Sequence, residues 1–155
     1  MSRERGTLAR MLGPIVRHLS IVTGLAGSLA AIVPGVLFWP RFSDPVYSGS
    51  LVRYYLIEMG LIGGTVLALL LVRATWGTSA VWAACGVTVA FAATAGITVG
   101  SLYLPAGILL GLSGILADLS QPRTLLRHVP IAIAAAAVQL GVMALVVLRL
   151  TSGSN

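Results

Sequence analysis

One carboxylate lies where an apolar sequence should not carry a charge. Glu58 falls inside RYYLIEMGLIGG, residues 53–64, in an apolar run long enough to cross a membrane, and the chain has only four acidic residues. It follows Arg53 by five residues, which places it roughly 7–8 Å deeper along a helix. An ionisable group at that depth costs a few kcal/mol unless it is paired, hydrated or protonated. Glu58 is therefore the first candidate for a proton, cation or ligand site.

Helical spacing predicts polar neighbours for Glu58 on its own face. Tyr54 lies one turn outward and Thr65 two turns inward. Together with Arg53 they form the candidate ion or ligand site. The alternative interpretation is structural: Glu58 is hydrogen-bonded to a tyrosine, or ion-paired with Arg53 or Arg41, and fixes how helices pack.

Small residues predict where helices approach closely. Gly60, Gly64 and Ala68 repeat every four residues on another face of the Glu58 helix. Because both faces need cover, we expect this helix to be central in its bundle. Further packing positions are two more glycines and an amide that can hydrogen-bond across helices, namely Gly107, Gly111 and Gln139.

The composition predicts an integral membrane protein. Of 155 residues, 57% are hydrophobic and 9% charged, and the mean hydropathy is +0.99, whereas soluble domains carry about 25% charged residues. A soluble fold of this length could not hide so much apolar surface. The net charge is +6 and every cation is Arg. No soluble surface is long enough for a nucleic-acid groove, so we expect the arginines to meet anionic lipid headgroups.

Span counting predicts an all-α bundle of five transmembrane helices, since each span needs about 20 apolar residues. From Ala74 to Ala117 no Asp, Glu, Lys or Arg occurs, and this length equals about 66 Å of helix, enough for two spans. A turn is expected in GITVGSLYLPAG, with Pro105 in the first turn of the fourth helix. The predicted spans are Leu19–Trp39, Leu51–Val72, Thr78–Thr98, Leu104–Leu119 and Val129–Leu150.

Arginine counts predict the orientation. With the N-terminus inside, seven arginines flank the inner ends and three the outer ends, so the C-terminus is expected outside. Residues 1–18 are predicted to form a basic amphipathic segment on the inner leaflet, bent at Pro14. Its expected contacts with anionic headgroups are Arg3, Arg5, Arg10 and Arg17. The competing interpretation is a secretory signal. Residues 19–150 form a single transmembrane domain, and residues 151–155 are predicted to be a disordered tail.

Other polar residues have ordinary explanations. Asp118 is expected to pair with Arg123 or Arg127. Hydroxyls within the spans can bond carbonyls of their own helix; they belong to Thr23, Ser28, Thr88, Thr94, Thr98 and Ser113. Two histidines alone make no metal site, and no phosphate loop or nucleophile elbow occurs. We therefore predict no cofactor and no metal.

These observations favour a small, non-enzymatic subunit of the bacterial inner membrane that works by packing with another membrane protein or with its own copies. The alternative is a transporter or channel component in which Glu58 handles a proton or cation from the outer side. An intramembrane enzyme would need a second group converging on Glu58, from Tyr54, Tyr103 or Gln139.

Overall fold

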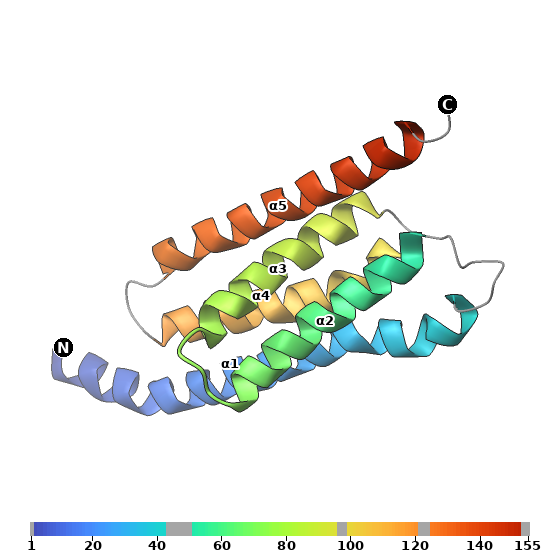
Figure 1. Ribbon diagram of the computed structural model, residues 1–155. Coiled ribbons are helices and arrows are strands. Elements are labelled where there is room, and N and C mark those ends of the chain that lie inside the picture. The colour runs from blue at the N-terminus through green and yellow to red at the C-terminus, as the bar shows by residue number, and fades with distance from the viewer. Residues whose placement is uncertain (1, 43–50, 96–98, 121–124, 153–155) are drawn as a thin grey trace.

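The computed structural model is a bundle of five long helices (Figure 1). It describes residues 2–42, 51–95, 99–120 and 125–152, with side chains in the first helix from Gly13 onward. In chain order the elements are α1 (Ser2–Phe42), α2 (Leu51–Leu71), α3 (Gly77–Thr94), the short 3₁₀ helix η2 (Gly100–Tyr103), α4 (Leu104–Leu119) and α5 (Leu125–Ser152).

The five predicted spans are confirmed. Each of α1 to α5 contains a stretch long and apolar enough to cross a membrane, which is the architecture of a multi-pass membrane protein. Helices suit this setting because they satisfy their backbone hydrogen bonds internally. The bounds of α4 agree with the prediction, whereas α3 ends at Thr94 rather than Thr98. Residues 96–98 lie outside the described part of the chain.

The two ends of the chain differ from the segments predicted for residues 1–18 and 151–155. α1 is a single helix that continues through Pro14 and Pro34, so residues 2–18 belong to the same helix as the first span. Their first part extends beyond the other helices (Figure 1). The amphipathic face predicted for residues 1–18 depends mostly on side chains before Gly13, which lie outside the described residues. At the other end, Thr151 and Ser152 belong to α5, so the predicted tail is shorter by these two residues.

The first four helices form a ring, and α5 lies outside it. α1 packs against α2 and α4, while α3 closes the ring by contacting α4 and, less extensively, α2. α5 runs along the outer side of α3 (Figure 1). The central helix is therefore α3, and the expectation that the Glu58 helix is central was wrong. Of the residues in the apolar stretch of α3, 44% are buried, against 22% in α2 and 6% in α5.

Small and hydroxyl residues explain the close packing in the ring. The α1–α4 contact is fastened by a reciprocal pair of hydrogen bonds: Ser20 Oγ donates to the Ser113 carbonyl at 2.9 Å, and Ser113 Oγ donates to the Ser20 carbonyl at 2.7 Å. A Cβ on the nearby Gly24 would meet Ser113 Oγ at 2.7 Å. Ser113 was expected to bond its own helix, so this inter-helix pair corrects that prediction.

The remaining described hydroxyls bond their own helices as expected. Thr23, Ser28, Thr88 and Thr94 each donate to the carbonyl four residues earlier, which lets polar side chains lie in an apolar bundle without a partner helix. Thr98 lies outside the described residues.

The core has two apolar clusters, one near each end of the ring. Leu56, Met59, Phe91 and Tyr103 form the first. The second consists of Val66, Val81, Ala84 and Leu110. Glu58 and the polar residues around it therefore lie beside the first cluster, and the end of α4 lies beyond the second.

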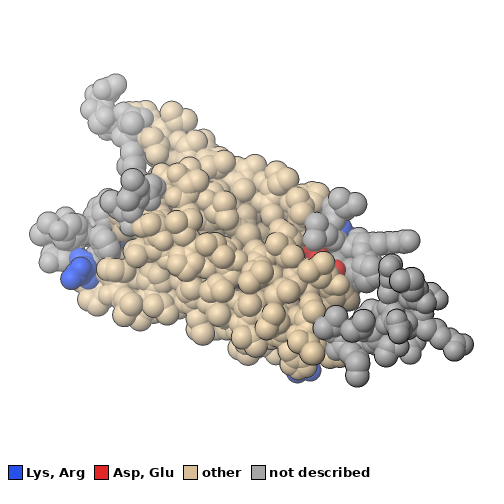
Figure 2. Space-filling model, turned by 180° about the vertical axis from the view of Figure 1, so that it is seen from behind, with Lys and Arg blue, Asp and Glu red and all other residues tan. Residues whose placement is uncertain are grey.

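The turn before α4 follows the sequence prediction. Pro105 lies in the first turn of α4, where its missing N–H costs little. A Cβ at Gly100 would meet the Ala92 carbonyl oxygen at 2.6 Å, so only glycine fits where η2 passes the end of α3. Charged side chains are confined to the two ends of the face shown in Figure 2, and the broad middle is free of them.

Candidate functional site

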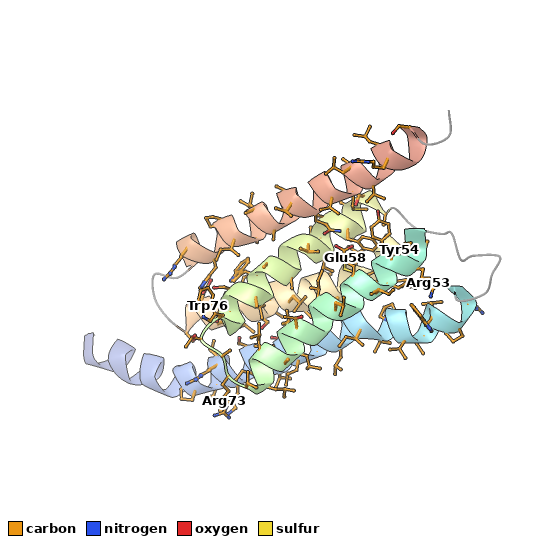
Figure 3. All side chains as sticks on the ribbon, viewed as in Figure 1. Arg53, Tyr54, Glu58, Arg73 and Trp76 are labelled. Carbon is orange, nitrogen blue, oxygen red and sulfur yellow. The ribbon has the colours of Figure 1, made fainter. Side chains whose placement is uncertain are left out.

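Glu58 is a half-buried carboxylate on α2 that has no hydrogen bond or ion pair within the described residues. Figure 3 shows Glu58 and Tyr54 on the edge of α2 that faces α3. Tyr54 is 65% exposed and Thr65 is exposed as well. Tyr54, Glu58 and Thr65 therefore define one open side of α2, which we call the Glu58 face.

Arg53 is directed away from Glu58. Its guanidinium carbon lies 5.1 Å from the centre of the Trp39 ring on α1, in a cation–π contact. Neither Arg53 nor Arg41 makes an ion pair with Glu58 in the described part of the chain. The structural pairing considered from the sequence is thus not formed, because the aromatic ring of α1 attracts the Arg53 side chain to the opposite side.

The other predicted neighbours of Glu58 do not form a ligand set with it. The Thr65 hydroxyl donates to the Leu61 carbonyl at 2.8 Å, so its proton is used within the helix. Tyr55 is the aromatic neighbour within electrostatic reach of Glu58, and its ring packs against Phe91 at 5.2 Å between centroids. Tyr103 packs edge-on against Phe91 in the buried core, and its hydroxyl forms no hydrogen bond with Glu58. Tyr54 and Tyr103 therefore do not converge on Glu58.

On α2, the glycine that meets a neighbouring helix is Gly63. A Cβ there would come within 2.8 Å of the Ser28 carbonyl oxygen on α1. Gly60 and Gly64, predicted from the repeat of small residues, have no heavy atom within 4 Å of such a Cβ, and Ala68 is exposed. Spacing identifies which residues share a face, but it does not tell which face a neighbour covers.

On α4, the predicted glycines do meet a neighbour. A Cβ at Gly107 would contact Val89 at 3.4 Å, and one at Gly111 would contact the Cys85 sulfur at 3.2 Å. Cys85 Sγ also lies 3.6 Å from the Gly107 carbonyl oxygen. These glycines form the contact surface between α3 and α4, and Cys85 is a packing residue within it.

A second carboxylate has the opposite environment. Asp118 lies in the last turn of α4, and its side chain is 1% exposed. Its Oδ2 accepts a hydrogen bond from Trp82 Nε1 of α3 at 3.1 Å. Its Oδ1 lies 2.8 Å from His128 Nδ1, in the first turn of α5. We call these three residues the Asp118 cluster.

The Asp118 cluster corrects the expected pairing with arginine. Arg127 is exposed and makes no ion pair with Asp118, and Arg123 lies outside the described residues. His128 takes that place because the first turn of α5 directs it back over the end of α4. The predicted last span begins at Val129, next to His128, but spacing within single helices could not show that His128 and Trp82 meet Asp118. The sequence signal for this cluster was that an acid, a histidine and a tryptophan each lie near the end of a different span.

Two buried polar atoms lack a hydrogen-bond partner among the described residues: the Tyr103 hydroxyl and Gln139 Nε2. Gln139 is 4% exposed on α5. The inter-helix hydrogen bond predicted for it is therefore not made by its amide nitrogen. Between α3 and α5, the Thr94 hydroxyl lies within hydrogen-bonding distance of two acceptors, the Ala90 carbonyl of its own helix and Met143 Sδ of α5.

The groups described above can hold or exchange a proton. No cluster of three or more His, Cys, Asp or Glu that could hold a metal occurs in the described ranges. An acid that orients a histidine resembles part of a catalytic triad, but the nearby Ser113 and Ser120 hydroxyls donate to backbone carbonyls. No family model, curated protein or solved structure matches this chain.

Proposed function

We propose that this protein is a small membrane subunit that works by packing another membrane protein chain against the Glu58 face. The observation that carries the proposal is a half-exposed carboxylate with no partner in the described chain. In lipid such a group costs a few kcal/mol, and a donor or cation on a second chain removes that cost. This is a structural role, with no reaction assigned.

The neighbouring residues support docking at this face. Tyr54 presents a large exposed ring with a polar tip, a residue type enriched in protein contacts. Within the described residues Tyr54 and Thr65 are exposed and Glu58 is half-buried, while α2 packs chiefly on α1 through Gly63 and Leu56. A partner helix therefore finds both an aromatic anchor and an unpaired acid.

The proposed setting is the bacterial inner membrane, with the N-terminus inside and the C-terminus outside. Arg41 ends α1, Arg53 begins α2 and Arg149 ends α5, and these three helix ends lie at one end of the bundle (Figure 1). The opposite end carries Arg17, Arg73 and Arg127, and the sequence places four more arginines beside the same span ends, namely Arg3, Arg5, Arg10 and Arg123. The excess of arginine at that second end supports placing it on the cytoplasmic side.

A second candidate function rests on the same carboxylate. Glu58 is within electrostatic reach of Tyr55 and is open at the edge of the bundle, which suits a proton or cation site in a transporter or channel component. The two candidates differ in what Glu58 meets: a fixed donor on a partner chain, or an exchangeable ion.

Site-specific photo-crosslinking tests the proposed contact. A photoreactive amino acid at Thr65, on the Glu58 face, is expected to give one discrete protein adduct in native membranes. The matched control is Ile108 of α4, which is 68% exposed and is expected to give lipid adducts only. Adducts of equal yield at both positions would contradict docking at this face.

The Glu58→Gln variant separates the two candidate functions. Under the docking proposal it lowers the Thr65 adduct, because a neutral amide loses the charge-assisted contact. Under the ion-site candidate the adduct is unchanged, while proton or cation flux into proteoliposomes is lost. Flux that persists in the variant would exclude Glu58 as the ion site.

A further inference from the structure

An open groove runs between α1 and α2. Its volume is about 440 Å³. The lining is apolar and comes from both helices: Ile32, Gly35, Val36, Trp39, Leu56, Ile57, Gly60 and Leu61. The groove exists because Gly60 has no side chain and nothing lies within 4 Å of where its Cβ would be. One turn deeper, Gly63 brings the two helices into contact and closes the floor.

Cations mark one end of this groove. Trp39 lines it, and the Arg53 guanidinium lies over the Trp39 ring. Arg41 is in the last turn of α1, two residues beyond Trp39. No acidic side chain is among the lining residues, since Glu58 projects toward α3 (Figure 3). An apolar slot that ends in a tryptophan carrying an arginine, close to the arginine-bearing end of α1, has the polarity of a phospholipid: chain inward, anionic head at the interface.

We propose that this groove is a binding site for one anionic phospholipid. An acyl chain lies along Val36, Ile57 and Gly60, and the phosphate meets Arg53 and Arg41. Arg53 is suited to this because its stacking on Trp39 holds the guanidinium plane in place while its N–H groups remain able to donate to phosphate oxygens. The proposal does not rest on the partner proposed for the Glu58 face, because the groove is lined by none of the three residues that define that face.

Two glycine substitutions give a matched test. Gly60→Leu fills the groove, whereas Gly64→Leu adds the same side chain one turn deeper, outside the lining residues. Nothing lies within 4 Å of a Cβ at either position, so both variants are expected to fold. Native mass spectrometry of the purified protein, titrated in detergent with phosphatidylglycerol or phosphatidylcholine, measures lipid binding and oligomeric state together.

The wild type and the Gly64→Leu variant are expected to bind one phosphatidylglycerol more tightly than phosphatidylcholine. Gly60→Leu is expected to weaken that binding about tenfold or more. Arg53→Gln is expected to reduce the preference for phosphatidylglycerol about fivefold, because an arginine near an anionic headgroup contributes this much, while chain binding persists. Equal binding of both lipids by the wild type, or unchanged binding by Gly60→Leu, would overturn the proposal.

A second measurement keeps the test independent of the variants' folding. Phosphatidylglycerol with brominated acyl chains should quench Trp39 fluorescence, measured as the difference between wild type and Trp39→Phe. Quenching no greater than that by brominated phosphatidylcholine would contradict the site. A dimer of the wild type that Gly60→Leu dissociates, with lipid binding unaffected, would instead assign the groove to a second copy and overturn the lipid proposal.

Discussion

The two described carboxylates of this bundle have contrasting surroundings. Asp118 is enclosed at the junction of α3, α4 and α5, with one hydrogen bond to each of its oxygens. Glu58 lies half-buried on α2 with no hydrogen bond or ion pair within the described chain. Both are surrounded by apolar sequence, so composition alone gives no reason for the difference.

The contrast shows how to distinguish a carboxylate that holds the fold together from one that is free to bind a partner or an ion. Asp118 has its donors supplied by two other helices of the same chain, so its hydrogen bonds are part of the fold and hold α5 to the ring. Glu58 has no such donors, so whatever stabilises its charge comes from outside the described residues: a partner, water or an ion. We therefore assign structural stability to Asp118 and interaction to Glu58.

The largest expected effect is from Asp118→Ala. Removing the acceptor leaves the buried Trp82 Nε1 and His128 without a partner, and breaking a buried pair in this way costs about 3–5 kcal/mol. The free energy of unfolding, measured by titration with a denaturing detergent, should fall accordingly. Glu58→Ala is the control, with a much smaller change. Equal losses for the two variants would remove the distinction between the two acids.

Displacing α5 should damage the Asp118 cluster from a distance. A Cβ at Gly86 would meet the backbone of Ala132 on α5, so Gly86→Val should cost about 1–3 kcal/mol by overpacking and draw His128 away from Asp118. Disulfide formation between cysteines introduced at Thr94 and Met143, which are in contact in the wild type, should decrease. Gly141→Val on α5, where nothing lies within 4 Å, should leave it unchanged.

Trp82→Phe should have a moderate effect. It removes one hydrogen bond to Asp118 and leaves the other in place, with an expected loss of about 1–3 kcal/mol for a buried acceptor left unsatisfied. A double-mutant cycle with His128→Ala measures how strongly the two donors depend on each other. Additive losses would show that Trp82 and His128 act on Asp118 independently, contrary to a single cluster.

The smallest expected effect is that of Glu58→Gln on stability. Because the carboxylate has no partner to lose within the described residues, the free energy of unfolding should fall by no more than about 0.5 kcal/mol. The same titration used for Asp118→Ala measures it. A loss of several kcal/mol would place Glu58 among the structural residues and would remove the observation on which the proposed function depends.

Much of the fold followed from the sequence because the bilayer fixes helix length. The charge-free segment Ala74–Ala117 is too long for one span, and the turn with Pro105 was found where helix signals break. Which faces meet was harder to predict. Gly60, Gly63 and Gly64 look alike in sequence, yet only Gly63 closely approaches α1, since small residues permit contact without specifying a neighbour.

The site was predicted less completely than the fold. Glu58 and Tyr54 were correctly placed on one face of a helix by their spacing. The side to which Arg53 turns depends on Trp39, fourteen positions away on another helix, and spacing within one helix carries no such information. The Asp118 cluster draws one residue from each of three helices, so it required the arrangement of those helices in space.

The contact between α1 and α4 has a consequence for how the protein is made. Roughly sixty residues separate the end of α1 from the start of α4, and ribosomes add about 5–20 residues per second. The first helix therefore waits for several seconds after its own synthesis before Ser113 arrives to bond Ser20. During that interval the insertion machinery or lipid must shelter the glycine-rich side of α1. The ring can close only after the fourth helix has emerged, and α5 is the last of the five helices to be made.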